Sequence, residues 1–259
     1  TQLLVFTGTV GKTTNRDTLT YGLRQLGISV RNNTLGYSNE LGILLTILDV
    51  SHFSPWNPFA WRHLFFRTVP HGGFAAIELG ADFYRDIPWF LGRFTPTAVF
   101  ISGSATMSWS RDIKPVYAER AALLSAVPPH GEVFYNADDP GTVSLIQQSA
   151  IRAAVIPISL AGTDEHSAVL THWSKNLYER GTFFGDEVVG FSYAGTTATL
   201  HFPRSLFEPQ IYGILFTFAF ILRHFPDEFA HLIAALPAYP FARDRLQFIK
   251  FSYGPVLIQ

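Results

Sequence analysis

The segment from residue 3 to residue 14 constrains this chain most, because it orders an apolar run, a glycine loop and a helix start. Four apolar residues, LLVF, lead directly into residues 7–14, TGTVGKTT. Glycine lets backbone N–H groups turn toward an anion without a Cβ in the way. A helix start adds unpaired N–H groups and the positive end of its dipole. This order predicts a strand, a phosphate-binding loop and a helix N-terminus.

The loop also carries the side chains that nucleotide chemistry requires. Lys12 can reach terminal phosphates, and Thr13 has the hydroxyl that such loops offer to Mg²⁺. Only two residues separate Gly8 from Gly11, whereas the usual motif has four, and a Gly/Thr turn that happens to contain Lys is the alternative. Because strand, loop and helix follow in the required order, we predict that the loop binds nucleotide phosphate through Gly8, Thr9, Val10, Gly11, Lys12, Thr13 and Thr14.

Short apolar runs alternate with helix-like segments over the next 150 residues, which predicts an α/β fold. The expected strands are 3–6, 28–31, 75–79, 98–101, 133–136 and 154–158, and the expected helices are 14–26, 38–48, 87–94 and 115–126. Later residues predict a hairpin (188–193 and 196–202), helices at 211–224 and 227–236, and a strand pair within 242–258. We expect a mostly parallel sheet with helices on both faces, and a small antiparallel portion late in the chain.

Composition excludes several classes of function. The formal net charge is −1 without a basic stripe, so nucleic acid is not expected as a partner. There is no cysteine, which excludes disulfides and thiolate metal sites and is compatible with a reducing cytoplasm. The 259 residues include 24 Phe, which predicts an aromatic-rich core. No apolar run of about 18 residues suggests a membrane span.

Residues 51–73 do not fit the alternation, because Trp and Phe mix there with Pro, His and Arg. One interpretation is a buried aromatic helix hairpin in a long loop. The other is a surface that docks on a membrane or on a partner, since aromatic residues with interspersed Arg suit an interface.

Five motifs occur in a fixed order along the chain: TGTVGKTT at 7–14, SNELG at 38–42, IELG at 77–80, NADDP at 136–140 and ARDRL at 242–246. This set resembles the ATP-binding central domain of the Mur ligases, most closely the branch that adds D-alanyl-D-alanine. The match covers most of residues 1–160, and its specific parts are the loop and the NADDP stretch. The resemblance implies a central domain over 1–238, with 51–73 as an insert, and the first strands of a truncated C-terminal domain over 239–259.

The resemblance implies an ATP- and Mg²⁺-dependent amide ligase of peptidoglycan precursor synthesis, located in the cytoplasm. A substrate carboxylate would attack the γ-phosphate, and an amine would then displace phosphate from the acyl phosphate. The implied substrates of the full-length protein are a UDP-linked muramyl peptide and D-Ala-D-Ala. The 259 residues alone are expected to bind nucleotide without ligating.

The resemblance also assigns roles to residues outside the loop. It implies that Lys12, Glu78 and Arg120 are catalytic, that Thr13 and Glu78 hold the metal, and that Asn39 and Arg243 contact the nucleotide. Each has a plainer interpretation: a helix cap or salt bridge for Glu78, a solvated helix start for Asn39, and a surface cation for Arg243. The two Asp residues at 138–139 could equally form an Asx turn before Pro140.

Three departures from the family pattern leave alternatives open. Residues 102–109 contain no His where the family has a metal ligand, and Arg120 stands where the family has a Lys that is often carbamylated. The site would then bind one Mg²⁺, or Arg120 would supply the missing charge, or catalysis has decayed to a nucleotide-binding or interaction module. Residues 207–212 lack the family's adenine-contacting Asn, and Tyr212 could stack on a base or belong to the core. A related ligase for folate or polyamino acids is a further alternative.

Overall fold

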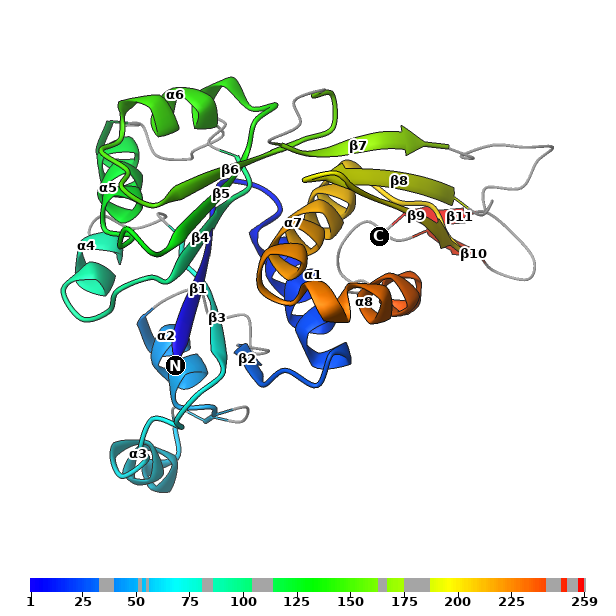
Figure 1. The fold of residues 1–259 in the computed structure, drawn as a ribbon. Coiled ribbons are helices and arrows are strands. Elements are labelled where there is room, and N and C mark those ends of the chain that lie inside the picture. Colours follow the sequence, from blue (N-terminus) through cyan, green and yellow to red (C-terminus); the bar gives the residue numbers. More distant parts are fainter. Residues whose placement is uncertain are drawn as a thin grey trace.

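A mostly parallel sheet forms the centre of the molecule (Figure 1). The computed structural model describes residues 1–32, 40–50, 53–54, 56–80, 86–103, 114–162, 167–174, 187–240, 248–250 and 256–258. Within these residues nine strands lie in the order β2-β3-β1-β4-β5-β6-β7-β8-β9, parallel as far as β7 and antiparallel from β7 to β9. Their bounds are β1 Gln2–Thr7, β2 Val30–Asn32, β3 Phe74–Glu78, β4 Ala98–Ile101, β5 Glu132–Asn136, β6 Ala154–Ser159, β7 Ala168–Trp173, β8 Glu187–Tyr193 and β9 Thr196–Phe202. The predicted fold class is confirmed.

Helices cover both faces of the sheet, because alternate residues of the inner strands bury apolar side chains on opposite faces. One face packs against α1 (Lys12–Gln25), α7 (Glu208–His224) and α8 (Phe229–Ala235). The other packs against α2 (Glu40–Ile47), α4 (Asp86–Leu91), α5 (Lys114–Ser125) and α6 (Pro140–Gln148). Figure 1 shows these two layers on either side of the strands.

Phenylalanine dominates the α1–α7 side of the core, as the composition predicted. Phe6, Phe100 and Phe134 are register partners on β1, β4 and β5, and their rings stack with centroids 4.5 and 4.8 Å apart. Phe216 and Phe220 of α7 pack edge-on or tilted against this ladder. Such pairs add to the burial energy of each ring, so the ladder fixes the strands beneath the carboxyl ends of β1, β4 and β5.

The antiparallel portion extends the main sheet through a strand that the sequence analysis did not predict. β7 pairs in parallel with β6 and antiparallel with β8, so the predicted hairpin β8–β9 is joined to the parallel strands. A separate two-stranded antiparallel sheet is formed by β10 (Phe248–Lys250) and β11 (Val256–Ile258), within the predicted strand pair.

The aromatic segment near residue 60 forms one short helix, α3 (Pro58–Phe65), with no buried residue. Trp56 is 92% exposed and Phe65 is 80% exposed. The interpretation of this segment as a buried aromatic hairpin is therefore wrong for the residues described. No residue of α3 belongs to either core cluster, whereas α2 and α4 contribute to the cluster on one face of the sheet.

Short 3₁₀ turns, Pro226–Glu228 and Leu236–Ala238, flank α8. The helix predicted over 227–236 is therefore α8 together with parts of these two turns. Among the residues described, no helix combines the length and the apolar character needed to cross a membrane.

Candidate functional site

The predicted loop lies where the strand order reverses. β1 has β3 on one side and β4 on the other, and the chain leaves β1 at Thr7 to form the loop and then α1. In open parallel sheets, ligands bind beyond the carboxyl ends of the strands at such a point. The ends of β3, β4 and β5 bring Glu78, Ser102 and Asn136 to the same edge.

The backbone of the loop has a conformation that depends on glycine. Gly8 has φ 129° and Gly11 has φ 85°. A Cβ on Gly8 would lie 2.5 Å from Ser102 Oγ and 2.9 Å from the Gly103 carbonyl oxygen. Thr9 N donates to that carbonyl at 2.9 Å, so the loop is held against the end of β4. Only glycine fits at position 8.

Lys12 and the start of α1 concentrate positive potential at this loop. Lys12 is the first residue of α1, and its Nζ donates to the Gly8 carbonyl oxygen at 2.8 Å. The residue before the helix, Gly11, has no side chain with which to cap the first turn. An ammonium group therefore lies over the loop, next to the positive end of a helix of 14 residues.

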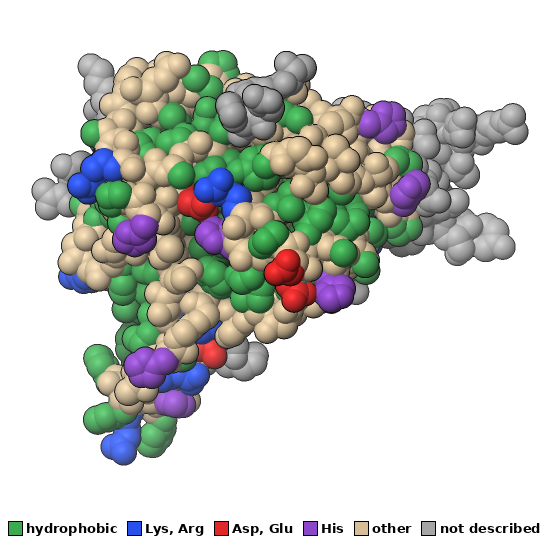
Figure 2. Space-filling view, in the orientation of Figure 1, with side chains coloured by type: hydrophobic (Ala, Val, Ile, Leu, Met, Phe, Trp, Pro, Cys, Tyr) green, Lys and Arg blue, Asp and Glu red, His purple; other side chains and the backbone are tan. Residues whose placement is uncertain are grey.

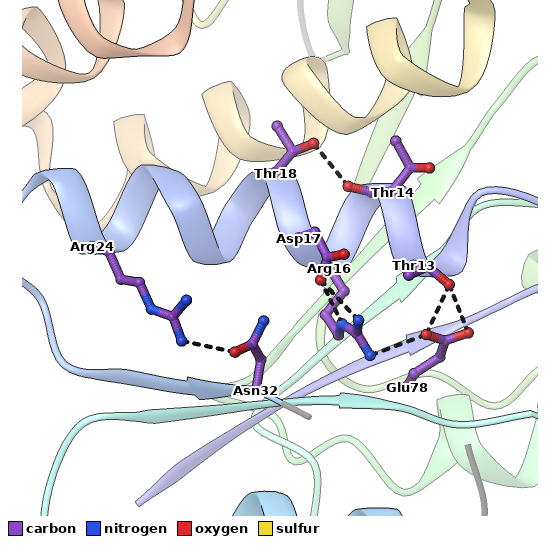
Figure 3. Close-up of polar contacts among 8 residues, drawn as sticks. All are labelled: Thr13, Thr14, Arg16, Asp17, Thr18, Arg24, Asn32 and Glu78. Atoms are coloured by element: carbon purple, nitrogen blue, oxygen red, sulfur yellow. Dashed lines mark hydrogen bonds and ion pairs between the residues drawn. The ribbon is translucent and has the colours of Figure 1, made fainter. Parts of the chain in front are cut away.

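A polar cluster connects the first turns of α1 to the end of β3 (Figure 3). Thr13 Oγ1 donates to Glu78 Oε1 at 3.1 Å and to Glu78 Oε2 at 3.0 Å. Arg16 Nη1 lies 3.1 Å from Glu78 Oε2, and its side chain is only 6% exposed. Arg16 also pairs with Asp17, its neighbour in the helix, at 2.8 Å. Glu78 thus has the salt-bridge role that was its plainer interpretation.

The same cluster has the chemistry of a magnesium site. The Thr13 hydroxyl and the Glu78 carboxylate are hard oxygen donors that converge at the loop, and Mg²⁺ usually takes one or two protein oxygens together with substrate phosphates. These residues fit that pattern, although the guanidinium of Arg16 shares the carboxylate. Within the described ranges, no group of three or more His, Asp or Glu side chains could form a metal site by itself.

A cavity of about 160 Å³ adjoins the loop on the side of α7. Asn15 of α1 borders it, and its Oδ1 is buried with no hydrogen-bond partner in the part of the chain that the structure describes. A buried acceptor of this kind is costly unless something donates to it. An unsatisfied acceptor therefore lies on a residue that borders the cavity. Its lining residues are Val10, Gly11, Asn15, Ser102, Asn136, Glu208, Pro209 and Tyr212.

Tyr212 links α7 to the NADDP stretch at the mouth of this cavity. Its hydroxyl donates to Asp138 Oδ2 at 2.6 Å, and Asp138 also accepts from Ser159 Oγ at 2.6 Å and from Leu160 N. Burial and the neighbouring Asp138 carboxylate raise the pKa of Tyr212 well above its ordinary value. The side chain is half-buried and borders the cavity, so it is neither wholly in the core nor free of a partner.

Asp139, the other carboxylate of that stretch, caps α6. Its Oδ2 accepts from Thr142 N at 3.0 Å and from Thr142 Oγ1 at 2.6 Å, and Pro140 occupies the first helical turn. This arrangement is a helix N-cap, which a sequence of Asp followed by Pro also favours.

The remaining predicted site residues lie elsewhere or outside the described residues. Arg120 is buried on α5, which packs on the opposite face of the sheet from α1, and Glu78 takes its polar contacts from Thr13 and Arg16. Asn39 and Arg243 fall outside the residues that the structure describes. The roles implied for these three residues stay predictions.

Sequence reasoning missed Arg16 and Asn15. Arg16 follows Thr13 by three residues, so the two share a helix face, and this spacing was a usable signal. Asn15 gave no comparable signal, because a polar residue in a helix is normally exposed.

Comparisons with known proteins agree with this architecture. No protein-family model and no curated protein sequence matches the chain. Solved structures do match. MurF from Acinetobacter baumannii matches at 16% identity and a TM-score of 0.72, over 99% of this chain and 50% of that one. MurF ligase from Thermotoga maritima in complex with ADP matches at 17% identity and a TM-score of 0.68, over 97% of this chain and 51% of that one.

A third match is a pseudomurein peptide ligase type C from Methanothermus fervidus, at 16% identity and a TM-score of 0.65, over 100% of this chain and 53% of that one. The chain thus spans about half the length of these structures. Together the matches establish a Mur-ligase-like fold.

Proposed function

We propose that this chain is the ATP-binding region of a ligase that joins an amino-acid or peptide amine to a carboxylate. The observation that carries the proposal is the convergence of Lys12, Thr13 and Glu78 around a glycine loop at the carboxyl ends of β1 and β3. The ADP held by one structure of the same fold supports a nucleotide as the ligand. The domain assignment implied by the resemblance, 1–238 and 239–259, belongs to this proposal.

The residues of the site would act mainly through charge and position. Lys12 would neutralise charge on the outer phosphates, and the backbone of Gly8 to Gly11 would orient them against the start of α1. Bound MgATP would supply the phosphoryl group that activates the substrate carboxylate. Thr13 and Glu78 are the residues that would hold the Mg²⁺, and the cavity beside Asn15 and Tyr212 would receive the rest of the nucleotide.

We propose that the acceptor is a UDP-linked muramyl peptide and that the added amine is D-Ala-D-Ala, in the cytoplasm where ATP is available. The matches to MurF structures support this choice within the wider fold. Ligation would need the parts of a longer chain that complete the matching structures, since this chain covers about half of them.

A second candidate is a nucleotide-binding module in which catalysis has decayed. The specific observation in its favour is the buried Arg16, which pairs with the only carboxylate assigned to the metal. The sequence also lacks a His between residues 102 and 109. Such a module would bind ATP and transfer no phosphate.

Calorimetric titration with ATP and Mg²⁺ tests the proposal. We expect binding by the unmodified chain and at least tenfold weaker binding by Lys12→Ala. Arg24→Ala is the matched control, because Arg24 is an exposed cation near the other end of the same helix. Unchanged ATP affinity in Lys12→Ala, with the fold intact by circular dichroism, would refute phosphate binding by the loop. Binding without phosphate release by a full-length protein with muramyl peptide would favour the decayed module.

A further inference from the structure

Exposed apolar side chains are concentrated on one small part of this molecule. Among the described residues eight large hydrophobic side chains are exposed, and six of them lie between residues 56 and 69. Figure 2 shows hydrophobic, basic and His side chains gathered on the projection that contains α3 in Figure 1. Contiguous exposed aromatic groups mark a surface that meets something apolar. The six residues are Trp56, Phe59, Trp61, Phe65, Phe66 and Val69.

The helix that presents these side chains is well formed. Asn57 caps it by accepting from Phe59 N at 2.9 Å, and Pro58 occupies its first turn. Trp61 lies edge-on to Phe53, with ring centroids 5.0 Å apart, and is tilted against Phe65 at 6.5 Å. The aromatic groups are therefore held in place by local structure while their outer faces stay exposed.

The base of this projection is fixed to the sheet. Arg31 is 7% exposed, and its guanidinium donates to the carbonyl oxygens of Ile47 at 3.0 Å and Gly72 at 3.2 Å. Arg67, just after α3, donates to the Asp49 carbonyl oxygen at 2.8 Å. Both ends of the segment are thereby tied to the end of α2 and to the start of β3.

The charged side chains of residues 56–73 have one sign, and the exposed Asp49 lies at the base of the projection beside Phe59 and Arg67. Residues 56–73 contain two Arg and two His and no Asp or Glu, in a chain whose formal net charge is −1. Arg62 is exposed and lies over the Phe66 ring at 5.7 Å. Exposed aromatic side chains beside cations, with no acidic residue in 56–73, match the interface of a membrane with anionic headgroups.

We propose that α3 and its flanks, residues 56–69, bind the surface of an anionic phospholipid bilayer. The Trp and Phe side chains enter the region of the headgroups, and Arg62 and Arg67 pair with lipid phosphates. With eight residues α3 lies on the surface and cannot span the bilayer.

The position of α3 suits this role. The segment leads into the amino end of β3, whereas Glu78 at its carboxyl end faces the loop. A docked molecule would keep the nucleotide site on the edge of the sheet that points away from the membrane (Figure 1). The proposal does not depend on what the loop binds.

Sedimentation with vesicles tests it, using the whole chain and either pure phosphatidylcholine or phosphatidylcholine with about one third phosphatidylglycerol. We expect binding to the anionic vesicles only, weakened by high salt. The triple variant Phe59→Ser, Phe65→Ser, Phe66→Ser should lose at least about tenfold in partitioning. Arg62→Gln should lose about fivefold, the equivalent of ~1 kcal/mol per basic residue. Trp56, which is 92% exposed, should shift its emission to shorter wavelength on these vesicles.

Val155→Ser is the matched control, because Val155 is an exposed apolar residue on β6. It should bind vesicles as the unmodified chain does. The proposal is overturned if the unmodified chain stays in the supernatant with anionic vesicles, or if Val155→Ser weakens binding as much as the Phe variant. It is also overturned if the unmodified chain is a dimer by sedimentation, fails to bind vesicles, and becomes a monomer in the Phe variant, since α3 would then meet a second copy.

Discussion

Arg16 Nη1 lies 3.1 Å from Glu78 Oε2, on the same carboxylate that accepts two contacts from the Thr13 hydroxyl. The residues are 62 positions apart, and both are largely buried, with side chains 6% and 15% exposed. A cation of the protein therefore lies on the carboxylate that the family resemblance assigns to Mg²⁺. We therefore expect this pair to affect both the stability of the chain and the response of the proposed site to Mg²⁺.

Removing the guanidinium should destabilise the fold. We expect Arg16→Met to lower the free energy of unfolding by about 3 kcal/mol, because Glu78 would keep a buried charge without its cation. Urea denaturation measures this change. Arg16→Met combined with Glu78→Gln should recover part of the loss, and strictly additive effects of the two substitutions would show that the pair is not coupled.

Arg16→Met should also change how strongly Mg²⁺ affects ATP affinity. If Glu78 holds Mg²⁺ as proposed, Arg16 would compete with the metal for this carboxylate, so Arg16→Met should increase the ratio of ATP affinity in Mg²⁺ to that in EDTA. Calorimetric titration under both conditions gives the ratio. Arg24→Met, at the far end of α1, is the control, and an unchanged ratio in Arg16→Met would exclude competition at Glu78.

Gly8 should not tolerate a side chain. Alanine at this position would need φ 129° and would place its Cβ 2.5 Å from Ser102 Oγ. We expect Gly8→Ala to cost about 2 kcal/mol or more in unfolding free energy and to weaken ATP binding at least tenfold. Gly27→Ala is the matched control. Gly27 also has a positive φ, 71°, but no atom lies within 4 Å of an added Cβ.

The Gly27 variant should cost about 1 kcal/mol and leave ATP affinity unchanged. Thermal unfolding and ATP titration of both variants distinguish loop geometry from general backbone strain. Equal ATP affinities in the two variants would contradict a phosphate role for the loop.

Two substitutions at Tyr212 should separate the contribution of its hydroxyl to stability from the contribution of its ring to ATP binding. Tyr212→Phe removes one hydrogen bond to the Asp138 carboxylate, which should cost about 1 kcal/mol of stability. The ring would still border the cavity, so ATP affinity should change little. Tyr212→Ala should weaken ATP binding severalfold, and an affinity equal to that of the unmodified chain would place the nucleotide elsewhere.

Acid should weaken the attachment of α7 to β5. Arg223 Nη2 and His224 Nε2 lie 2.6 and 2.7 Å from the Glu132 carboxylate. Burial alone would raise the pKa of Glu132, but the hydrogen bonds and charges of His224 and Arg223 outweigh it and lower this pKa below 4.5. Between the folded and unfolded pKa values the unfolded chain binds more protons, so this stability is present above about pH 4.5 and is lost as the pH falls through the folded pKa.

Glu132→Gln should therefore flatten the dependence of unfolding free energy on pH below 4.5. Glu228→Gln is the control, because Glu228 pairs with His231 at an exposed position. Urea denaturation across this pH range measures the slopes. An unchanged slope in Glu132→Gln would assign the acid sensitivity to other carboxylates.

The sequence alone determined the elements that local patterns encode. Continuous apolar runs such as residues 98–101 are buried on both faces, so they specify parallel strands between helices, and the fold class followed from them. The glycines of the loop were also visible in the sequence, and Gly8 and Gly11 are residues that reach positive φ at low cost. β7 was missed, because its short mixed sequence becomes a strand only through its neighbours β6 and β8.

Only the tertiary structure decided which distant side chains meet. Glu78 faces Arg16, and Tyr212 reaches Asp138 across 74 positions, because strand order and helix packing bring them to one edge of the sheet. Burial was likewise decided by tertiary structure. The aromatic residues around α3 look like core in sequence, yet none of them belongs to either core cluster. Composition records how apolar a segment is, whereas the arrangement of the other elements decides whether anything lies over it.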